Sequence, residues 1–389
     1  MSDHKKDILF VATADWDHPY WTNKQYVAEQ LAALGHRVLY VESQGLRAPK
    51  ASTRDLKRIA ARLRRGSAPP RRVRENLWVW SPLVVPLQSF RAVRALNRGL
   101  LKLGVSLWSR VLRLQPTVIW TYSPMTTELY DVDRYDQLVY HAVDDIKAQP
   151  GMPASTIAAA EGRLSRRADT IFVTAPNLLE VHRRTNPNTH YFSNVCDFRH
   201  FNRAMAAETE VPTDLARLPG PRVGFVGAVS AYKLDFPLIR AVAAARPGWS
   251  FAFIGSVGEG DYATDVSAFA DLPNVHFLGG RPYRALPGYL KGIDVAILPN
   301  RHNDYTRSMF PMKFFEYLAA GRPVVSTKLP ALAEFGHVAD LCDGPDEFLA
   351  AVDRAVLGKS APLAARLAAA RERTYEARTA KMLEVLRWN

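Results

Sequence analysis

Short apolar runs alternate with helical patterns along nearly the whole chain, and this alternation constrains the fold more than any other feature. The first series of runs comprises residues 8–12, 37–41, 77–80, 117–121, 137–141, 170–174 and 189–192. Helical patterns at 23–34, 90–114, 154–167 and 177–184 separate several of them. Parallel strands joined by helices produce this pattern of apolar runs, because such strands are buried on both faces. The sequence therefore predicts an open, mostly parallel sheet in the N-terminal half.

A second series of apolar runs begins after a proline-rich stretch at residues 212–221. Its strands are predicted at 222–226, 250–254, 275–278, 294–298 and 323–326. A chain of 389 residues exceeds what one core usually supports, so two domains are expected. We predict an α/β fold of two Rossmann-like domains facing across a cleft, with ligands at the carboxyl ends of the strands. The predicted boundaries are 1–212 for the first domain, 213–372 for the second, and 373–389 for a C-terminal helix that packs back on the first.

The segment from Ser308 to residue 327 is predicted to form a helix, a tight turn and a strand. Lys313 and Glu316 lie three residues apart and share one helix face, and Gly321 ends the helix. A helix start attracts phosphate, an ammonium adds charge, and a carboxylate one turn later can accept hydrogen bonds from a ribose diol. We therefore place a nucleotide diphosphate here, with Ser308 and Met312 beside it. An ordinary lysine–glutamate pair on a core helix has the same spacing.

Other candidate donor-binding residues follow strands of the second series. Gly227 comes directly after the strand at 222–226, where a missing side chain lets a ligand approach the backbone, and Ser230 and Lys233 follow within reach of a phosphate. Arg281 and Tyr283 follow another strand and could form a wall for a nucleobase, although Tyr283 could equally be a packing residue. The chain has neither a dinucleotide-binding GxGxxG motif nor a P-loop, which argues against an NAD enzyme or an ATPase.

In the first domain, His141 and Asp144 lie at the end of the strand at 137–141. A carboxylate there could take a proton from an attacking hydroxyl, and the imidazole could do the same or stabilise charge; an aspartate after a strand is also a common helix cap. Asp15 and Trp16, after the first strand, are candidate acceptor contacts. The Asp-x-Asp tripeptides at 15–17 and 131–133 are too short to indicate a metal, and we predict no metal and no cofactor.

The net charge of +13 comes largely from the segment 46–75. Such a segment can be a solvated surface, a nucleic-acid site or a membrane-binding site. The amphipathic pattern at 90–114 favours an anionic membrane, and no nucleic-acid-binding signature is present. The predicted membrane-facing residues are Arg58, Arg62, Arg64, Arg65, Arg94, Arg98, Lys102 and Trp108.

Two further patterns bear on location. Cys196 and Cys342 are far apart in sequence, which argues against a disulfide framework or a cysteine zinc site. The charged N-terminus with its short apolar run does not fit a signal peptide, and no run reaches the roughly 18–20 apolar residues that cross a bilayer. We expect a cytoplasmic protein associated peripherally with the inner face of the cell membrane.

Five segments together resemble the GT-B glycosyltransferases, particularly bacterial exopolysaccharide and teichuronic-acid-type enzymes, including xanthan-type glucuronosyltransferases and family 4-like members. They are residues 140–145, 168–177, 192–198, 223–229 and 312–325. The resemblance implies that the second domain binds a nucleotide sugar. It makes Glu316 the residue that holds the ribose, Lys313 a diphosphate ligand, Gly227 the glycine of the phosphate loop, and Asp144 the catalytic base.

The implied activity is transfer of a sugar from a nucleotide-diphosphate sugar to a hydroxyl of a lipid-linked or cell-envelope glycan. Ser308 replaces the first of two glutamates that retaining members carry, and Ala228 replaces an arginine, so the resemblance slightly favours an inverting, metal-independent reaction. Two alternatives stay open at this point. One is a nucleotide-sugar epimerase of the same fold, and the other is a non-catalytic basic protein that binds membranes or nucleic acid.

Overall fold

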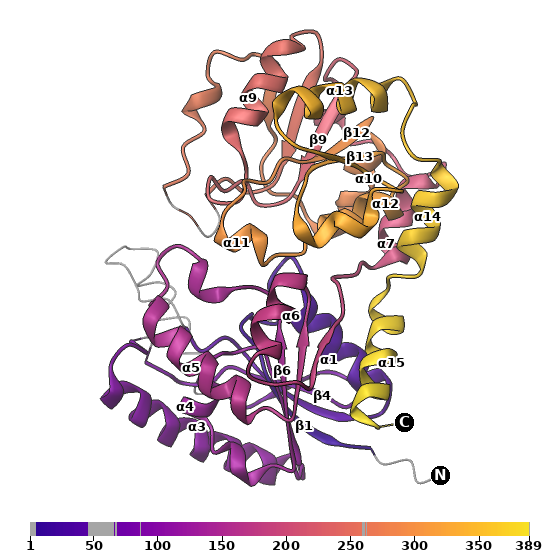
Figure 1. The fold of residues 1–389 in the computed structure, drawn as a ribbon. Coiled ribbons are helices and arrows are strands. Elements are labelled where there is room, and N and C mark those ends of the chain that lie inside the picture. Colours follow the sequence, from indigo (N-terminus) through magenta and orange to yellow (C-terminus); the bar gives the residue numbers. More distant parts are fainter. Residues whose placement is uncertain are drawn as a thin grey trace. The chain divides into compact units, whose positions relative to one another are not determined.

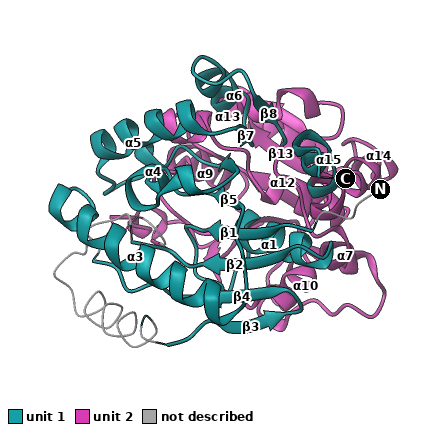
Figure 2. Ribbon diagram, turned by 90° about the horizontal axis from the view of Figure 1, so that it is seen from below, with its two compact units in different colours: residues 1–192, 379–389 teal, residues 193–378 magenta. Residues whose placement is uncertain are grey.

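The computed structural model describes residues 5–45, 66, 68–85, 87–258, 261 and 263–388. The chain divides into two compact units, which Figure 2 colours separately. Unit 1 comprises residues 1–192 and 379–389, and unit 2 comprises residues 193–378. The proline-rich stretch at 212–221 thus lies inside unit 2. Hydrogen bonds explain this position, because the Asn202 amide donates to the carbonyl of Ala319 (2.9 Å) and Lys291 Nζ donates to the carbonyl of Ala206 (2.6 Å).

Eight described strands form the sheet of unit 1 in the order β3-β4-β2-β1-β5-β6-β7-β8. All neighbouring pairs are parallel except β3 with β4. The strands are β1 (Asp7–Val11), β2 (Arg37–Val41), β3 (Arg71–Arg74), β4 (Leu77–Trp80), β5 (Val118–Thr121), β6 (Gln137–Ala142), β7 (Thr170–Val173) and β8 (Thr189–Tyr191). The predicted parallel sheet is therefore confirmed, with one antiparallel edge strand added.

Helices cover both faces of this sheet, as Figure 1 shows. On one face pack α3 (Arg91–Val111), α4 (Thr126–Leu129), α5 (Ala154–Arg167) and α6 (Pro176–Arg183). On the other lie α1 (Asn23–Ala33) and the end of α15 (Tyr375–Leu386). Strand side chains alternate between the two cores, so that Leu9 joins the first and Phe10 the second. This double burial explains why the strands read as continuous apolar runs.

The sheet of unit 2 repeats this topology in the order β11-β10-β9-β12-β13-β14, with every pair parallel. Its strands are β9 (Arg222–Val226), β10 (Ser250–Ile254), β11 (Val275–Phe277), β12 (Val295–Leu298), β13 (Val324–Thr327) and β14 (Asp340–Cys342). Its helices are α7 (Phe198–Asn202), α8 (Thr213–Ala216), α9 (Phe236–Ala245), α10 (Leu286–Lys291), α11 (Asp304–Arg307), α12 (Lys313–Ala319), α13 (Pro345–Val356) and α14 (Leu363–Arg371). The order places β9 where unit 1 has β1, and β13 where unit 1 has β6.

Two strands, β3 and β14, are absent from the sequence prediction. β3 carries three arginines and none of the apolar alternation that marks a strand, yet Arg71 forms an ion pair with Asp17 at 2.5 Å and Arg74 forms one with Glu29 at 2.9 Å. The carboxyl end of the basic segment is thus an edge strand held by acidic residues of its own unit. Charged edge strands of this kind resist pairing with other chains.

Candidate functional site

The carboxyl end of β9 and the helix α12 form the centre of the candidate site in unit 2. The Tyr317 hydroxyl accepts a hydrogen bond from the Val226 amide (2.8 Å) and donates one to the Val226 carbonyl (3.1 Å). The tyrosine is fully buried, so these bonds fix one turn of α12 against the last residue of β9. The sequence analysis did not identify Tyr317, because Val226, the partner of its hydroxyl, lies 91 residues away in sequence.

Gly227 lies immediately beyond this contact, against the stem of Lys313. A Cβ atom on Gly227 would lie 3.7 Å from Lys313 Cε and 3.0 Å from Phe225 Cζ. A Cβ on Gly255, after the neighbouring strand β10, would lie only 1.8 Å from the Gly227 carbonyl oxygen. The backbone contact restricts the end of β10 to glycine, whereas a side chain at position 227 would require Phe225 to shift. Gly227 itself is partly exposed.

Lys313 and Glu316 form an ion pair of 3.0 Å at the start of α12. The glutamate side chain is only 6% exposed, whereas the lysine side chain is 25% exposed. Burial raises the pKa of Glu316, and the charge and hydrogen bond of Lys313 oppose that rise. The structure thus brings together three of the predicted donor residues, Gly227, Lys313 and Glu316, and places a buried carboxylate beside a reachable cation.

Two residues that the sequence analysis did not assign lie close enough to interact electrostatically with Glu316. The charge of Asp197 contributes to the raised pKa of Glu316, and that of Glu316 contributes to the raised pKa of the buried Cys196 thiol, whose main cause is burial. Asp197 also caps α7, because its carboxylate accepts the amide of His200 at 3.0 Å. Cys196 and Asp197 come from the turn at 194–197. This turn is part of a segment that carries the family resemblance, but it was not part of the predicted site.

The remaining donor candidates near β9 differ in exposure. Ser230 is fully buried and Ser308 nearly so, whereas Met312 and Lys233 are half-buried. Ser308 is the C-cap of α11 and Met312 the N-cap of α12, so both flank the turn before Lys313. The Lys233 ammonium lies over the ring of Tyr232 at 5.2 Å and over that of Tyr305 at 5.5 Å. These aromatic contacts hold its charge in the loop after β9.

Arg281 and Tyr283 make contacts that favour packing roles. Arg281 forms an ion pair with Asp214 (2.6 Å) and donates to the Tyr289 hydroxyl (2.5 Å), and the hydrogen bond to Asp214 is the main reason that its pKa is raised. The Tyr283 ring stacks on His200 with a centroid separation of 4.0 Å and an interplanar angle of 12°. The face of Tyr283 that meets His200 is therefore not available to a nucleobase.

In unit 1, the two candidate catalytic residues near the end of β6 differ in burial. His141 is fully buried among aromatic rings, stacked on Tyr122 at 4.7 Å and edge-on to Trp120 and Phe172. Asp144, three residues later, is partly exposed. Of the two, Asp144 is therefore the side chain that a substrate could reach.

A network of charges holds the segment that follows Asp144. Lys147 forms an ion pair with Asp145 at 2.7 Å and with Glu161 at 3.5 Å, and Glu161 accepts a hydrogen bond from the buried Tyr140 hydroxyl at 2.7 Å. Burial alone would lower the pKa of Lys147, but these acidic partners raise it. The network links β6 to α5 and fixes the backbone on both sides of Asp144.

The two candidate acceptor contacts, Asp15 and Trp16, also differ in burial. Trp16 is 4% exposed, its amide donates to Glu42 Oε1 at 2.8 Å, and its indole packs against Trp21 and Tyr40. Asp15 is half-buried, and its carbonyl accepts a hydrogen bond from the Gln25 side chain at 2.9 Å. The Trp16 indole therefore completes the core of unit 1, and Asp15 is the more accessible of the pair.

Among the predicted membrane-facing residues, Arg58, Arg62, Arg64 and Arg65 lie outside the described residues. Arg94 is turned inward and pairs with Glu128 at 3.3 Å, and the half-buried Trp108 packs against the core. Arg98 and Lys102 are exposed on α3. The same helix also exposes four aliphatic side chains whose spacing places them on one face, namely Leu96, Leu103, Leu107 and Val111.

Within the described part of the chain, no helix is long and apolar enough to cross a membrane. The described residues also contain no group of three or more histidine, cysteine, aspartate or glutamate side chains arranged to hold a metal ion.

Comparison with known proteins identifies several that are similar to this chain. Residues 220–357 match the model of the family "Glycosyl transferases group 1". The chain is 31% identical over 258 residues to a Bacillus subtilis (strain 168) protein named "Putative teichuronic acid biosynthesis glycosyltransferase TuaH". That match covers 61% of this chain and 62% of the length of TuaH.

Solved structures match over nearly the full length. Sucrose-phosphate synthase from Thermosynechococcus elongatus superposes with a TM-score of 0.69 at 14% identity, covering 98% of each chain. HepE of Anabaena, solved in complex with UDP-glucose, superposes with a TM-score of 0.63 at 16% identity, covering 97% of this chain and 99% of HepE. At these identities the likeness concerns the fold.

Proposed function

We propose that this chain, which has the GT-B fold and a group 1 glycosyl transferase domain at residues 220–357, transfers a sugar from a nucleotide-diphosphate sugar to a hydroxyl of a lipid-linked or cell-envelope glycan. The resemblance noted in the sequence is confirmed by these comparisons. Because a fold by itself does not fix an activity, the proposal depends on the residues of the site.

The observation that carries the proposal is the ion pair of Lys313 with the buried Glu316 beside Gly227. A buried carboxylate is costly, and one that stands at the carboxyl end of a parallel sheet next to a partly exposed glycine is well placed to accept hydrogen bonds from a ribose diol. Lys313 supplies positive charge for a diphosphate. An ordinary surface ion pair would need neither the burial nor the glycine.

The names of the relatives support the choice of substrates. HepE was solved with UDP and with UDP-glucose, which supports a nucleotide diphosphate sugar as donor. TuaH is named for teichuronic acid biosynthesis, which supports an envelope glycan as acceptor.

In the proposed reaction, Asp144 acts as the general base. The acceptor hydroxyl gives its proton to Asp144 while its oxygen attacks the anomeric carbon, and the bond from that carbon to the nucleotide diphosphate breaks. Lys313 offsets part of the charge of the departing diphosphate, and we propose that the step needs no metal. Direct displacement inverts the anomeric centre.

We further propose that unit 1 binds the inner surface of the cell membrane from the cytoplasm through α3. The aliphatic face of Leu96, Leu103 and Leu107 would enter the headgroup region, while the exposed Lys102 beside it would meet anionic lipid. Arg98 instead pairs with Asp131 of the same unit at 3.8 Å. This contact would bring the enzyme to a lipid-linked acceptor.

Thermal-shift measurements with a panel of nucleotide diphosphates and nucleotide sugars test the donor site. A ligand that binds the folded state alone raises the melting temperature, and the shift should appear for one base family and vanish in Lys313→Ala/Glu316→Ala. Lys328→Ala, which removes an exposed lysine paired with Asp343, is the matched control and should keep the shift. No shift with any nucleotide in the wild type would refute the donor assignment.

Asp144→Asn tests the base. We expect transfer to an envelope glycan acceptor to fall by about 10²–10⁴-fold, with donor binding unchanged. Asp133→Asn removes an exposed carboxylate from the same unit and should leave transfer intact. Full transfer by the Asp144 variant would remove it as the base, and epimerised donor without transfer would favour a nucleotide-sugar epimerase instead.

Flotation with vesicles rich in phosphatidylglycerol tests the membrane contact. Leu103→Asp/Leu107→Asp should abolish flotation, whereas Val181→Asp, at an exposed apolar position on α6, should not. Equal flotation of all three proteins would contradict a role for α3.

A further inference from the structure

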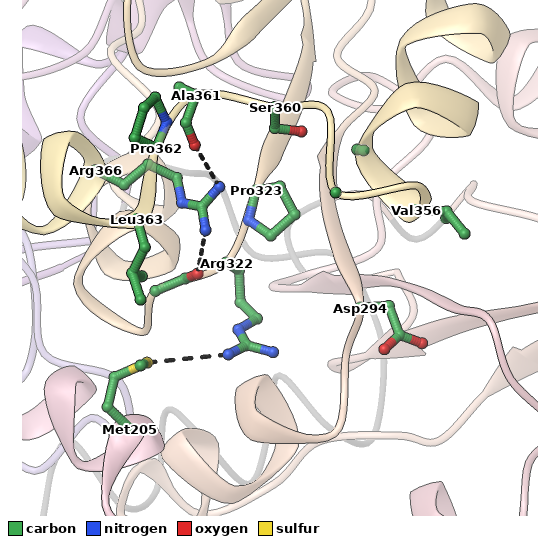
Figure 3. Close-up of a pocket in the computed structure, with 13 residues that line it drawn as sticks. Met205, Asp294, Arg322, Pro323, Val356, Ser360, Ala361, Pro362, Leu363 and Arg366 are labelled. Carbon is green, nitrogen blue, oxygen red and sulfur yellow. Dashed lines mark hydrogen bonds between the residues drawn. The ribbon is translucent and has the colours of Figure 1, made fainter.

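A cavity of about 440 Å³ opens in unit 2 at the edge of the sheet opposite to Gly227. Asp294 directly precedes β12 and Arg322 lies just before β13, so the cavity faces the amino ends of these strands, whereas Gly227 follows the carboxyl end of β9. Ser360, from the loop between α13 and α14, and Arg366, from α14, also line it (Figure 3). Its volume falls within the range of pockets that hold small molecules, roughly 300–1,000 Å³.

Two arginines line this cavity, and Figure 3 shows both guanidinium groups beside it. Arg322 donates to the carbonyls of Ile293 (3.0 Å) and Ala320 (3.2 Å). Arg366 donates to the carbonyls of Ala361 (2.7 Å) and Gly321 (3.0 Å). Among the described residues, neither guanidinium forms an ion pair with a carboxylate. Two positive charges thus share the cavity with one carboxylate, that of Asp294, whose charge raises the pKa of Arg322 against the effect of burial.

The cavity also contains polar atoms whose hydrogen-bonding capacity is unused. Arg366 Nε and Ser360 Oγ are both buried, and neither has a hydrogen-bond partner among the described residues. Burial lowers the pKa of both guanidiniums, and the charge of Arg322 adds to the effect on Arg366. A buried donor without an acceptor destabilises the fold, so these atoms favour a ligand that can accept hydrogen bonds.

The bonds to main-chain carbonyls have a structural role, because several of these carbonyls belong to the turn that ends α12. Capping the negative end of a helix accounts for the Arg322 and Arg366 bonds to Ala320 and Gly321. It does not account for the buried Nε–H of Arg366, for the hydroxyl of Ser360, or for the cavity between them. Those features indicate a ligand with several acceptor oxygens.

We propose that this cavity is an anion-binding site for a phosphate group, either inorganic or on a small organic molecule, separate from the proposed donor site. A phosphate offers acceptor oxygens in several directions, which suits two guanidinium forks and a hydroxyl. The carboxylate of Asp294 lies in the same cavity, where its Oδ2 accepts the Arg222 amide at 2.7 Å, and its single negative charge can offset only one of the two guanidiniums. The phosphate would neutralise the excess positive charge and take the unused donors.

Isothermal titration with sodium pyrophosphate tests the site, with sodium chloride at matched ionic strength as reference. The titration uses the Lys313→Ala/Glu316→Ala protein, so that loss of the donor site cannot be mistaken for loss of this one. We expect saturable binding of one equivalent. Arg366→Gln should weaken it at least tenfold, whereas Arg217→Gln, which removes an exposed charge outside the cavity, should leave it unchanged.

Ser360→Ala provides a second variant in case Arg366→Gln fails to fold. It removes a hydroxyl that has no hydrogen-bond partner in the part of the chain that the structure describes, so stability should hold while pyrophosphate binds several-fold more weakly. Binding that is insensitive to both substitutions would overturn the site, as would the absence of saturable binding. Saturable binding that these substitutions weaken supports it regardless of whether the chain transfers a sugar.

Discussion

The loops that follow β1 and β9 occupy equivalent places in two sheets of the same strand order, yet they are filled in opposite ways. After β1 the chain places the indole of Trp16 into the core, against Trp21 and Tyr40. After β9 it places Gly227, whose backbone lies beside Lys313 with no side chain between them. One loop completes a core with an aromatic side chain, and the other places bare backbone beside a partly exposed lysine.

This difference shows that the strand order determines where a loop lies, whereas the side chains of the loop determine whether it packs into the core or can contact a ligand. Both loops stand at the carboxyl edge of a parallel sheet, where ligands commonly bind. In unit 1 an aromatic residue occupies that position, so chemistry is left to the end of β6 with Asp144. In unit 2 the glycines at 227 and 255 allow the two strand ends to pack closely, without a side chain over the backbone at either position. The comparison predicts different consequences when each loop is changed.

Trp16→Ala should have the largest effect, and on stability. Removing a buried aromatic side chain leaves a cavity, which typically costs about 3–5 kcal/mol. Denaturant unfolding followed by circular dichroism measures the loss, and nucleotide binding by the folded variant should be unchanged. Reduced donor affinity in a variant of near-normal stability would show that the loop after β1 also has a binding role.

Gly227→Val should have the next largest effect, and on binding. Its Cβ would meet Phe225 at 3.0 Å, and the further methyls would fill the space beside Lys313. We expect donor affinity to fall about a hundredfold, equivalent to about 2.7 kcal/mol. Titration of the purified variant with its nucleotide measures the change, with the exposed Gly248→Val as the matched control, since a Cβ there meets no atom within 4 Å. Equal loss in both variants would contradict a special role for Gly227.

Tyr317→Phe should have a smaller effect on both properties. It leaves the buried Val226 amide without its acceptor, which costs about 1–3 kcal/mol of stability. Because α12 would be less firmly held at the end of β9, donor affinity should fall several-fold. Parallel unfolding and titration experiments measure the two effects. If stability falls and affinity does not, the hydroxyl serves the fold alone.

Glu316→Gln should have the smallest effect, which is a change in how the stability of the protein depends on pH. Burial raises the pKa of Glu316 above its ordinary value of 4.5, so the folded protein binds this proton more tightly than the unfolded chain. The stability of the wild type should therefore decline as pH rises through the window between 4.5 and the raised pKa. The glutamine variant should lack that decline, as unfolding measured from pH 4.5 to 8 would show. Parallel profiles for both proteins would contradict the raised pKa.

The sequence predicted the strands of both parallel series because their apolar runs were buried on two faces. It missed β3, whose arginines are stabilised by Asp17 and Glu29 from distant segments, and such pairing leaves no local pattern. The spacing of Lys313 and Glu316 indicated a shared face, but it could not distinguish a buried carboxylate from an exposed pair. The hydrogen-bonding role of Tyr317 could not be predicted, because the residue that its hydroxyl contacts, Val226, lies 91 residues away in sequence.

By itself, then, the sequence determined the α/β class, the alternation of elements and the residue types at each strand end, since these depend on local periodicity. The tertiary structure alone decided which of those residues meet. It buried Trp16 and His141, turned Arg94 towards Glu128, engaged Arg281 with Asp214, and placed two arginines in one cavity with the carboxylate of Asp294. Such outcomes depend on contacts between segments distant in sequence, where burial and charge are fixed only after the chain has folded.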